Sequence, residues 1–380
     1  MKSGQLLFTS EKGWQELTSN IPNIQPNLIL LFGATNLIKS NIHIDKLKGK
    51  YPKAIMVGCS SSGEIAGTHV HDDTLVATLV EFESTRIKYV YQTIEDPSDS
   101  YEAGKKLVTQ LIDPELKHVF VISEGLQING SELVRGLRDM LPAQIAATGG
   151  LAGDGALFSE TFILNEEGNS QSKLVSAIGF YGNNLQISYS SLGGWDSFGV
   201  ERLVTKSTGN VLFELDGVPA LQLYKSFLGD YAKDLPASGL LFPLNLRAER
   251  NSEPVVRTIL AVDEENQSLT FAGDIPEGSY VRLMKANFDR LIEGAIGAAK
   301  GTMSNNNKNP ELAILISCVG RKLVLKQLIE EEVEGVKEVL GAQTLLCGFY
   351  SYGEISPFVA EAKCELHNQT MTITTFSENV

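Results

Sequence analysis

The chain has 380 residues, of which 43% are hydrophobic and 21% are charged, and its formal net charge is −14. This composition is typical of a globular protein, and the acidic balance argues against a nucleic-acid surface, which needs an excess of Lys and Arg. The apolar runs are too short to span a bilayer, so we expect no membrane partner.

The cysteines lack the paired spacing of a disulfide framework or a metal site. They are Cys59, Cys318, Cys347 and Cys364. A chain of this size needs no disulfides, and the N-terminal sequence MKSGQLLFTS lacks the long apolar core of a signal peptide. We therefore expect a cytoplasmic protein with reduced thiols.

Strand-like apolar runs come in pairs along the chain. The pairs are residues 28–33 with 55–58, residues 119–125 with 144–150, and residues 313–320 with 344–348. Between the strands of the second pair and of the third pair, apolar residues recur at helical spacing, which predicts a helix in each stretch. The helix of the second pair is predicted to begin behind a Ser131 cap. The helix between the strands of the first pair is poorly marked. A strand, a helix and a strand of this length predict a crossover with parallel strands, whose tips emerge at one edge of the sheet.

Glycines end these strands at a recurring spacing. Gly33 and Gly58 are 25 residues apart, Gly125 and Gly150 are 25 apart, and Gly320 and Gly348 are 28 apart. Another glycine follows five residues later in each case, at Gly63, Gly155 and Gly353. The recurrence predicts one structural unit used three times.

Antiparallel hairpins are predicted after each unit. The strand pairs are residues 74–82 with 86–94, residues 174–181 with 185–192, and residues 255–262 with 268–273. We therefore predict a mixed α/β fold in which helices flank mixed parallel and antiparallel sheets. The division falls into two domains, residues 1–215 and 216–380, because residues 210–240 resemble a connecting helix and loop.

Acids accompany the glycine tips. Glu64, Asp154 and Glu354 would repel a phosphate and attract an ammonium group, and no phosphate-binding glycine motif is present. Arg321 follows a strand tip, where a guanidinium suits a carboxylate. Together they predict a site for a zwitterion such as an amino acid. The alternative is structural, with glycines at bulges, acids that cap backbone N–H groups, and an ion pair between Arg321 and Glu354.

The predicted ligand site takes in the three tips. Its residues are Gly58, Cys59, Ser60, Ser61, Gly63, Glu64, Gly150, Asp154, Cys318, Arg321, Gly348, Tyr350, Ser351, Gly353 and Glu354. No metal site is predicted, because His69, His71, Asp72 and Asp73 lack a further ligand and fit a solvated loop. No catalytic residues are predicted either, since the chain has no nucleophile elbow, Ser–Lys pair or HExxH motif.

Motifs in the same order resemble the FIST family, the sensory domains named for F-box and intracellular signal transduction proteins. GCSSSGEI (58–65), GGLAGDG (149–155) and GWDSFG (194–199), with residues 204–221, are similar to its N-terminal half. LLFPLNLR (240–247), GDIPEGSYVRLM (273–284), SCVGR (317–321), GFYSYGEISP (348–357) and LHNQT (366–370) are similar to its C-terminal half.

The resemblance implies a sensory protein that binds a small ligand, amino acids being among the suggestions, and signals to an effector. No fused kinase, receiver or cyclase segment is recognisable, so we expect a separate signalling partner such as a histidine kinase. The F-box of eukaryotic relatives is not recognisable either, and we expect a bacterial-type protein. We expect no cofactor. Two alternatives are a haem protein that senses nitric oxide beside a histidine kinase or a cyclic-di-GMP enzyme, with His367 as a guess for the ligand, and an uncharacterised enzyme.

Overall fold

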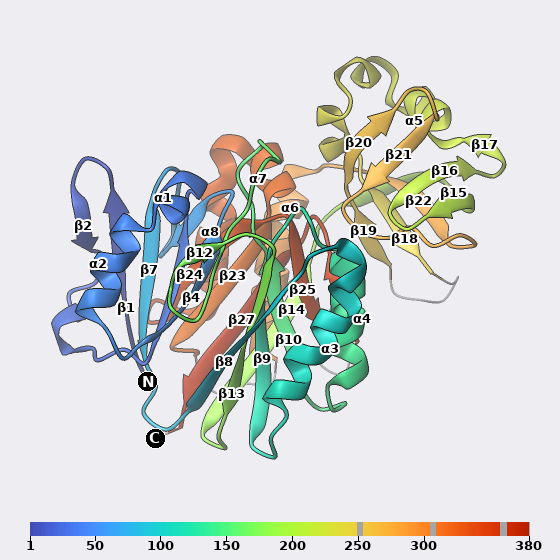
Figure 1. Ribbon diagram of the computed structural model, residues 1–380. Coiled ribbons are helices and arrows are strands. Elements are labelled where there is room, and N and C mark those ends of the chain that lie inside the picture. Colours follow the sequence, from blue (N-terminus) through green and yellow to red (C-terminus); the bar gives the residue numbers. More distant parts are fainter. Residues whose placement is uncertain (249–253, 305–308, 358–362, 380) are drawn as a thin grey trace.

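The computed structural model describes residues 1–248, 254–304, 309–357 and 363–379, and it consists of a large body and a smaller lobe (Figure 1). Three mixed sheets form the body, and a fourth sheet forms the lobe. The mixed α/β fold predicted from the sequence is therefore confirmed. In the described part of the chain, every helix is too short or too polar to cross a membrane.

The first unit of the body begins at the N-terminus. Its elements are β1 (Lys2–Thr9), β2 (Gly13–Glu16), a 3-10 turn (Ile21–Asn23), β3 (Leu28–Gly33), α1 (Thr35–Ser40), α2 (Ile42–Lys50), β4 (Ile55–Ser60), β5 (Glu64–Ala66), β6 (His69–His71) and β7 (Leu75–Glu81). Strands β3 and β4 are parallel neighbours, and β7 lies antiparallel on the other side of β3. The predicted crossover is thus present even though its helices carry a weak apolar pattern.

The second unit repeats this plan with stronger helices. Its elements are β8 (Arg86–Thr93), α3 (Ser100–Leu111), β9 (Leu116–Ser123), α4 (Gly130–Met140), β10 (Ala146–Leu151), β11 (Ile163–Leu164), β12 (Ser170–Gln171) and β13 (Leu174–Tyr181). Asn129 caps α4, because its side chain accepts the N–H of Glu132. The predicted Ser131 cap is wrong, since that residue is already helical and its hydroxyl accepts the N–H of Asp274 instead.

The third unit is split by the lobe. Its elements are β14 (Leu185–Leu192), α6 (Phe288–Met303), β23 (Leu312–Cys318), α7 (Val319–Leu325), a 3-10 turn (Lys326–Leu328), α8 (Ile329–Leu340), β24 (Leu345–Ser351), β25 (Gly353–Pro357), β26 (Cys364–His367) and β27 (Met371–Glu378). Strands β23 and β24 are again parallel, with β27 antiparallel to β23. The predicted threefold unit is therefore confirmed.

Each unit donates a short hairpin to the next sheet. The first unit's β5–β6 pairs with β24, the third unit's β25–β26 pairs with β10, and the second unit's β11–β12 pairs with β4. The three exchanges form a closed cycle, so no sheet of the body is built from one unit alone. Strands β5 and β25 follow their glycine tips directly, and β11 follows its tip after residues 152–162. The exchange therefore brings all three tips to one place.

Two of the three predicted hairpins are wrong. Strand β7 pairs with β1 and β3, whereas β8 pairs with β13 in another sheet. Likewise β13 lies in the second sheet and β14 pairs with β27 in the third. These turns connect one unit to the next, and the carboxylate of Glu378 holds the first of them by accepting the N–H groups of residues 83–85. The third hairpin, β20 with β21 in the lobe, is confirmed.

The body's core lies where its three sheets meet. Alternate residues of β3, such as Leu30 and Phe32, reach this shared core together with Phe120 of β9 and Ile314 of β23. The intervening residues face the helices, α1 and α2 over the first sheet, α3 and α4 over the second, and α6 and α8 over the third. Burial on both faces explains why the central strands read as continuous apolar runs.

The lobe is inserted between β14 and α6. Its elements are β15 (Asp196–Thr208), β16 (Val211–Leu215), β17 (Val218–Pro219), α5 (Ala220–Leu228), 3-10 turns (Gly229–Asp234 and Ala237–Leu241), β18 (Leu244–Arg247), β19 (Val255–Arg257), β20 (Ile259–Asp263), β21 (Ser268–Phe271) and β22 (Tyr280–Lys285). It has its own apolar core. The division after residue 215, which falls at the end of β16, stays a prediction.

Candidate functional site

The three glycine tips meet and are tied to one another by backbone hydrogen bonds. The N–H of Ser62 donates to the carbonyl of Tyr350 (2.9 Å), and the N–H of Tyr350 donates to the carbonyl of Gly63 (2.9 Å). The second tip joins through Gly153, whose N–H donates to the carbonyl of Ser60 (3.1 Å), and the N–H of Tyr352 returns to Leu151 (3.1 Å). The tips thus lie together, as the repeat predicted, but these N–H groups bind other tips and are not offered to a ligand.

Three glycines occupy equivalent positions in the parallel strand pairs. Gly58 lies beside Leu31, Gly149 beside Val121 and Gly348 beside Leu315. A Cβ atom at these glycines would lie 1.7, 1.8 and 1.8 Å from the neighbouring carbonyl oxygen, so only glycine fits. The predicted repeat, which matched Gly150 and Gly155 to the glycines of the other two tips, is therefore one residue out of register in the second unit. At Gly150 an added Cβ would meet the side chain of Ile316 instead.

Two of the tip acids have the same surroundings. Ser61 Oγ donates to Glu64 Oε1 (2.5 Å) and Thr74 donates to Oε2 (2.6 Å), while Ser351 and Thr370 bond Glu354 in the same way (2.6 and 3.0 Å). Burial raises the pKa of Glu64 to about 7 and that of Glu354 to about 8 against these hydrogen bonds. Both carboxyls therefore take up a proton near neutral pH more readily than an exposed glutamate.

Asp154 has a different role from these two glutamates. Its carboxylate accepts the backbone N–H groups of Phe158, Ser159 and Glu160 (2.9, 2.8 and 2.9 Å) and also the hydroxyl of Tyr352. These hydrogen bonds fix the conformation of residues 154–160, a segment that we call the wall loop. Capping of neighbouring N–H groups, the structural alternative for the tip acids, applies to this residue.

Arg321 is fully buried and its guanidinium is engaged within the protein. Nε and one terminal nitrogen donate to Glu332 Oε2 (3.1 and 2.7 Å). The terminal nitrogens also reach the carbonyls of Gly193 (2.5 Å), Leu291 (2.7 Å) and Gln369 (3.4 Å). Both interpretations of Arg321 from the sequence need correction, because its ion pair is with Glu332 rather than Glu354 and no donor faces a cavity.

The other predicted residues lie within the tips or the core behind them. Tyr350 is buried and donates its hydroxyl to Glu332 (2.8 Å), and Ser60 Oγ accepts the N–H of Phe162 (3.0 Å). Burial raises the pKa of the Cys59 thiol well above its usual value and raises that of Cys318 as well. All four cysteines are buried and free, and thiols in such surroundings are not reactive.

A cavity of about 770 Å³ opens beside the first tip. We call it the acidic cavity, because five carboxylates and one ammonium group line it: Glu64, Asp72, Asp73, Asp154, Glu160 and Lys39. Its walls come from α1 with the residue before it, the β4–β5 connection, the β6–β7 turn and the wall loop. Of the predicted site residues, Ser61, Gly63, Glu64 and Asp154 line it. A ligand-binding role for them stays a prediction.

Several residues of the acidic cavity were not assigned to the site from the sequence. Lys39 and Glu160 carried no signal, and Asp72 and Asp73 were noted only beside His69 and His71. A signal was present for the last two, since HDDT (71–74) and HNQT (367–370) are equivalent turns. Asp73 and Gln369 share a left-handed backbone, with φ of 58° and 62°.

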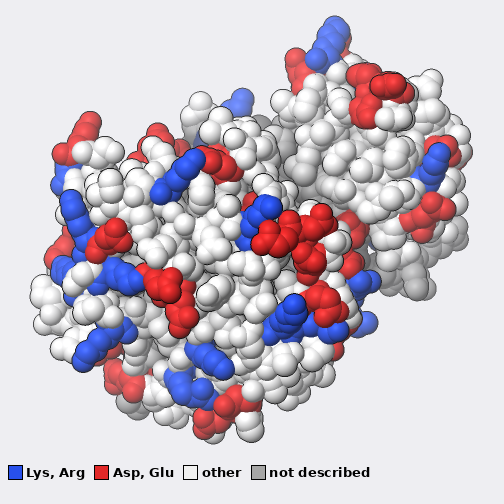
Figure 2. Space-filling model, in the orientation of Figure 1, with Lys and Arg blue, Asp and Glu red and all other residues white. Residues whose placement is uncertain are grey.

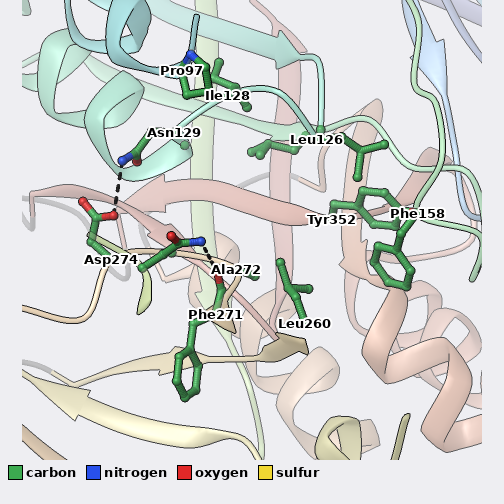
Figure 3. Close-up of a pocket in the computed structure, with 15 residues that line it drawn as sticks. Pro97, Leu126, Ile128, Asn129, Phe158, Leu260, Phe271, Ala272, Asp274 and Tyr352 are labelled. Carbon is green, nitrogen blue, oxygen red and sulfur yellow. Dashed lines mark hydrogen bonds between the residues drawn. The ribbon is translucent and has the colours of Figure 1, made fainter. Parts of the chain in front are cut away.

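Two further cavities lie where the lobe meets the body. One of about 280 Å³ is lined by residues after β9, by Tyr352, and by Phe271 and Asp274 of the lobe (Figure 3). Asn129 donates to Asp274 (3.2 Å) across it. The other cavity, of about 810 Å³, we call the lobe groove, and it shares Phe158 and Leu260 with the first. Its remaining lining residues are Ala156, Tyr231, Asp234, Leu235, Pro236, Ala237, Ser238, Leu240, Leu241, Ile259, Phe288, Leu323, Val324 and Lys326.

Comparison with known proteins gives the family. The FIST N domain model matches residues 27–218, and the FIST C domain model matches residues 220–357. The chain belongs to the FIST family. FIST domains are associated with sensory signal transduction.

One curated relative and one solved structure show more distant similarity. The chain is 25% identical over 353 residues to "Uncharacterized protein MJ1623" of Methanocaldococcus jannaschii, an alignment that covers 84% of this chain and 64% of that protein. The chain thus spans less than two thirds of that relative's length. A structure of "T. maritima PurL complexed with FGAR" aligns with 93% of this FIST chain and with 67% of the PurL chain at 11% identity. The TM-score of 0.19 is too low to indicate a shared fold.

The cavities of this FIST protein give the haem alternative no support. The described residues that line the three large cavities include no His, Cys or Met to serve as an axial ligand. His367, the guessed ligand, is fully buried with Nε2 2.7 Å from the carbonyl of Ser356, and burial lowers its pKa to about 4. Within the described residues, His, Cys, Asp and Glu form no group of three that suits a metal ion.

Proposed function

We propose that this FIST protein is a sensor whose acidic cavity binds a small molecule with an ammonium group, such as an amino acid or a related amine. One observation carries the proposal: the exposed carboxylates of Asp72, Asp73 and Glu160 line a cavity of about 770 Å³ together with a single lysine. The other two carboxylates of the lining, Glu64 and Asp154, are buried and held by hydrogen bonds within the protein. The volume of the cavity suits a small metabolite, and convergent charges of one sign raise the local concentration of the opposite charge.

The carboxylates of the cavity differ in what engages them. Lys39 pairs with Glu160 (2.7 Å), and Lys322 pairs with Asp72 from outside the lining. Among the described residues, no ion pair or hydrogen bond engages the side chain of Asp73. An incoming ammonium group would therefore meet Asp73 first and compete with Lys39 for Glu160. The carboxylate of an amino acid would then turn to the released Lys39.

We expect a separate signalling protein, such as a histidine kinase, to read the ligand. This expectation comes from the sensory association of FIST domains. A nucleic-acid partner is not expected. Charged side chains of both signs are interspersed over the described surface that faces the reader in Figure 2, without a broad basic patch.

Binding without turnover is the role we propose. Two serine–glutamate pairs resemble catalytic groups, Ser61 with Glu64 and Ser351 with Glu354, but both pairs are buried and engaged in hydrogen bonds. A substrate would have to displace Thr74 or Thr370 to reach either carboxylate. Turnover of any compound on a broad panel, lost in Glu64→Gln, would replace the sensor with an enzyme.

The test is a thermal-shift panel of cationic and anionic metabolites. Lysine, arginine and putrescine should raise the melting temperature, and glutamate and succinate should not. The variant Asp73→Asn/Glu160→Gln should lose the shift, whereas Glu265→Gln/Glu334→Gln, which removes the same charge from exposed positions elsewhere, should keep it. Equal shifts with anions, or a shift that survives Asp73→Asn/Glu160→Gln, would contradict the proposal.

A further inference from the structure

The lobe groove gathers apolar side chains that solvent reaches. Phe158, Tyr231, Leu260 and Phe288 all line it, and their exposed fractions are 41%, 52%, 41% and 48%. Such side chains are normally scattered singly over a surface, so a group of four around one concavity is a sign of binding. The groove lies between two parts of the molecule, where small-molecule sites are often found.

The shape of the lobe groove favours a small molecule over a flat protein surface. Its volume is about 810 Å³, and it adjoins the cavity of about 280 Å³ through Phe158 and Leu260. Ligand pockets for drug-sized molecules fall in the range of ~300–1,000 Å³ and are lined mainly by apolar and aromatic side chains. The body supplies one wall through α7 and the wall loop, and the lobe supplies the other.

Aromatic surface is available for stacking in the groove. Phe158 stacks on Tyr352 with ring centroids 4.6 Å apart and planes inclined by 14°. Figure 3 shows this pair beside Leu126, with Leu260 of the lobe nearby. Tyr352 covers one face of the Phe158 ring, and the exposed part of the ring extends into the groove. An aromatic ring of a ligand would continue this stack.

The charges of the groove cancel. Asp234 and Lys326 are the charged residues among those that line it, and within the described residues neither side chain takes part in an ion pair or a hydrogen bond. The opposite charges of Asp234 and Lys326 leave the groove with no net charge to attract an ion. A net-neutral ligand is favoured, because an ion without a partner is costly to place in apolar surroundings. This chemistry differs from that of the acidic cavity.

From these observations we infer that the lobe groove is a second small-molecule site, which takes a net-neutral apolar ligand that carries an aromatic ring. Phe158 and Leu260 form the contact between the ring and the two walls. The inference is independent of the ammonium ligand proposed above, since the groove and the acidic cavity have separate linings.

The test is a fluorescence titration with N-phenyl-1-naphthylamine, a neutral aromatic probe. The full-length protein should bind the probe saturably at one site. Leu260→Ser on the lobe and Phe158→Ser on the wall loop should each weaken binding by ~10-fold or more, which corresponds to ~1.4 kcal/mol. Ile112→Ser is the matched control, because Ile112, at the C-terminal end of α3, is an exposed apolar residue (50%) outside the groove lining.

The outcomes separate the groove from general stickiness. Both groove variants should keep the wild-type circular dichroism spectrum, since their side chains are partly exposed, and Phe158→Leu should recover part of the affinity by restoring apolar volume. Absence of saturable binding would overturn the inference. A loss of affinity in Ile112→Ser equal to that in Leu260→Ser would do the same.

Discussion

Replacement of Arg321 by methionine tests whether this residue stabilises the protein or binds a ligand. Arg321 and Glu332 are both fully buried, and the guanidinium makes two bonds to the carboxylate. Removal of one partner of a buried pair leaves an uncompensated charge and costs about 3–5 kcal/mol. Three backbone carbonyls lose a donor as well, so the upper part of this range is expected.

The assay is thermal unfolding followed by circular dichroism. Since 1 kcal/mol shifts the melting temperature of a large domain by about 2–4 °C, Arg321→Met should lower it by about 6–20 °C. Arg290→Met is the control, because Arg290 is 57% exposed in its pair with Asp196 and surface pairs contribute only about 0–1 kcal/mol. The double variant Arg321→Met/Glu332→Gln should lose less stability than the two single variants combined.

A second readout locates the effect. Arg321 holds the carbonyls of Gly193 and Leu291, which flank the entry to and the exit from the lobe. Hydrogen exchange in Arg321→Met should therefore rise at residues 193–195 and 286–291. A melting temperature within the range of the Arg290→Met control, with ligand affinity lost instead, would refute the structural role.

Three other predictions concern Glu354, Gly149 and the wall loop. First, the raised pKa of Glu354 (to about 8) means that the folded state holds a proton that the unfolded state has released, so its contribution is present at low pH and is lost as pH rises toward 8. Wild-type stability should therefore fall relative to Glu354→Gln between about pH 5 and 8 in melting curves; a constant difference would contradict the raised pKa. Second, Gly149→Ala should prevent soluble expression, whereas Gly49→Ala, where an added Cβ meets nothing within 4 Å, should not; equal yields would contradict the close approach. Third, residues 155, 157 and 159 of the wall loop line the acidic cavity while residues 156 and 158 line the lobe groove, so lysine should change the affinity for N-phenyl-1-naphthylamine, and the probe should change that for lysine by the same factor. Independent affinities would show that the loop does not couple the sites.

The sequence predicted the repeating unit but not the way in which the units combine. Gly58 and Gly348 revealed the repeat because a carbonyl of the neighbouring strand excludes any side chain there. The exchange of β5, β11 and β25 between sheets is invisible in the sequence, since these strands have two to five residues and no distinctive pattern. The turn at residues 83–85 read as a hairpin because local turn chemistry does not reveal which sheets its two strands join.

The candidate site was predicted in part for a related reason. Glu64 and Asp154 line the acidic cavity, but Arg321 does not, because Glu332 from the following helix captures its guanidinium. The sequence placed Arg321 at a strand tip, whereas it lies in α7, and a residue of α8 eleven positions later is not an obvious partner for it. Lys39 and Glu160 reach the cavity from different units, and only the exchanged hairpin places them together.

A crystal structure grown with putrescine tests the central claim most directly. The account predicts electron density for the diamine in the acidic cavity, with an ammonium group within hydrogen-bonding distance of the Asp73 or Glu160 carboxylate. An empty acidic cavity at saturating putrescine, or density confined to another part of the molecule, would contradict it.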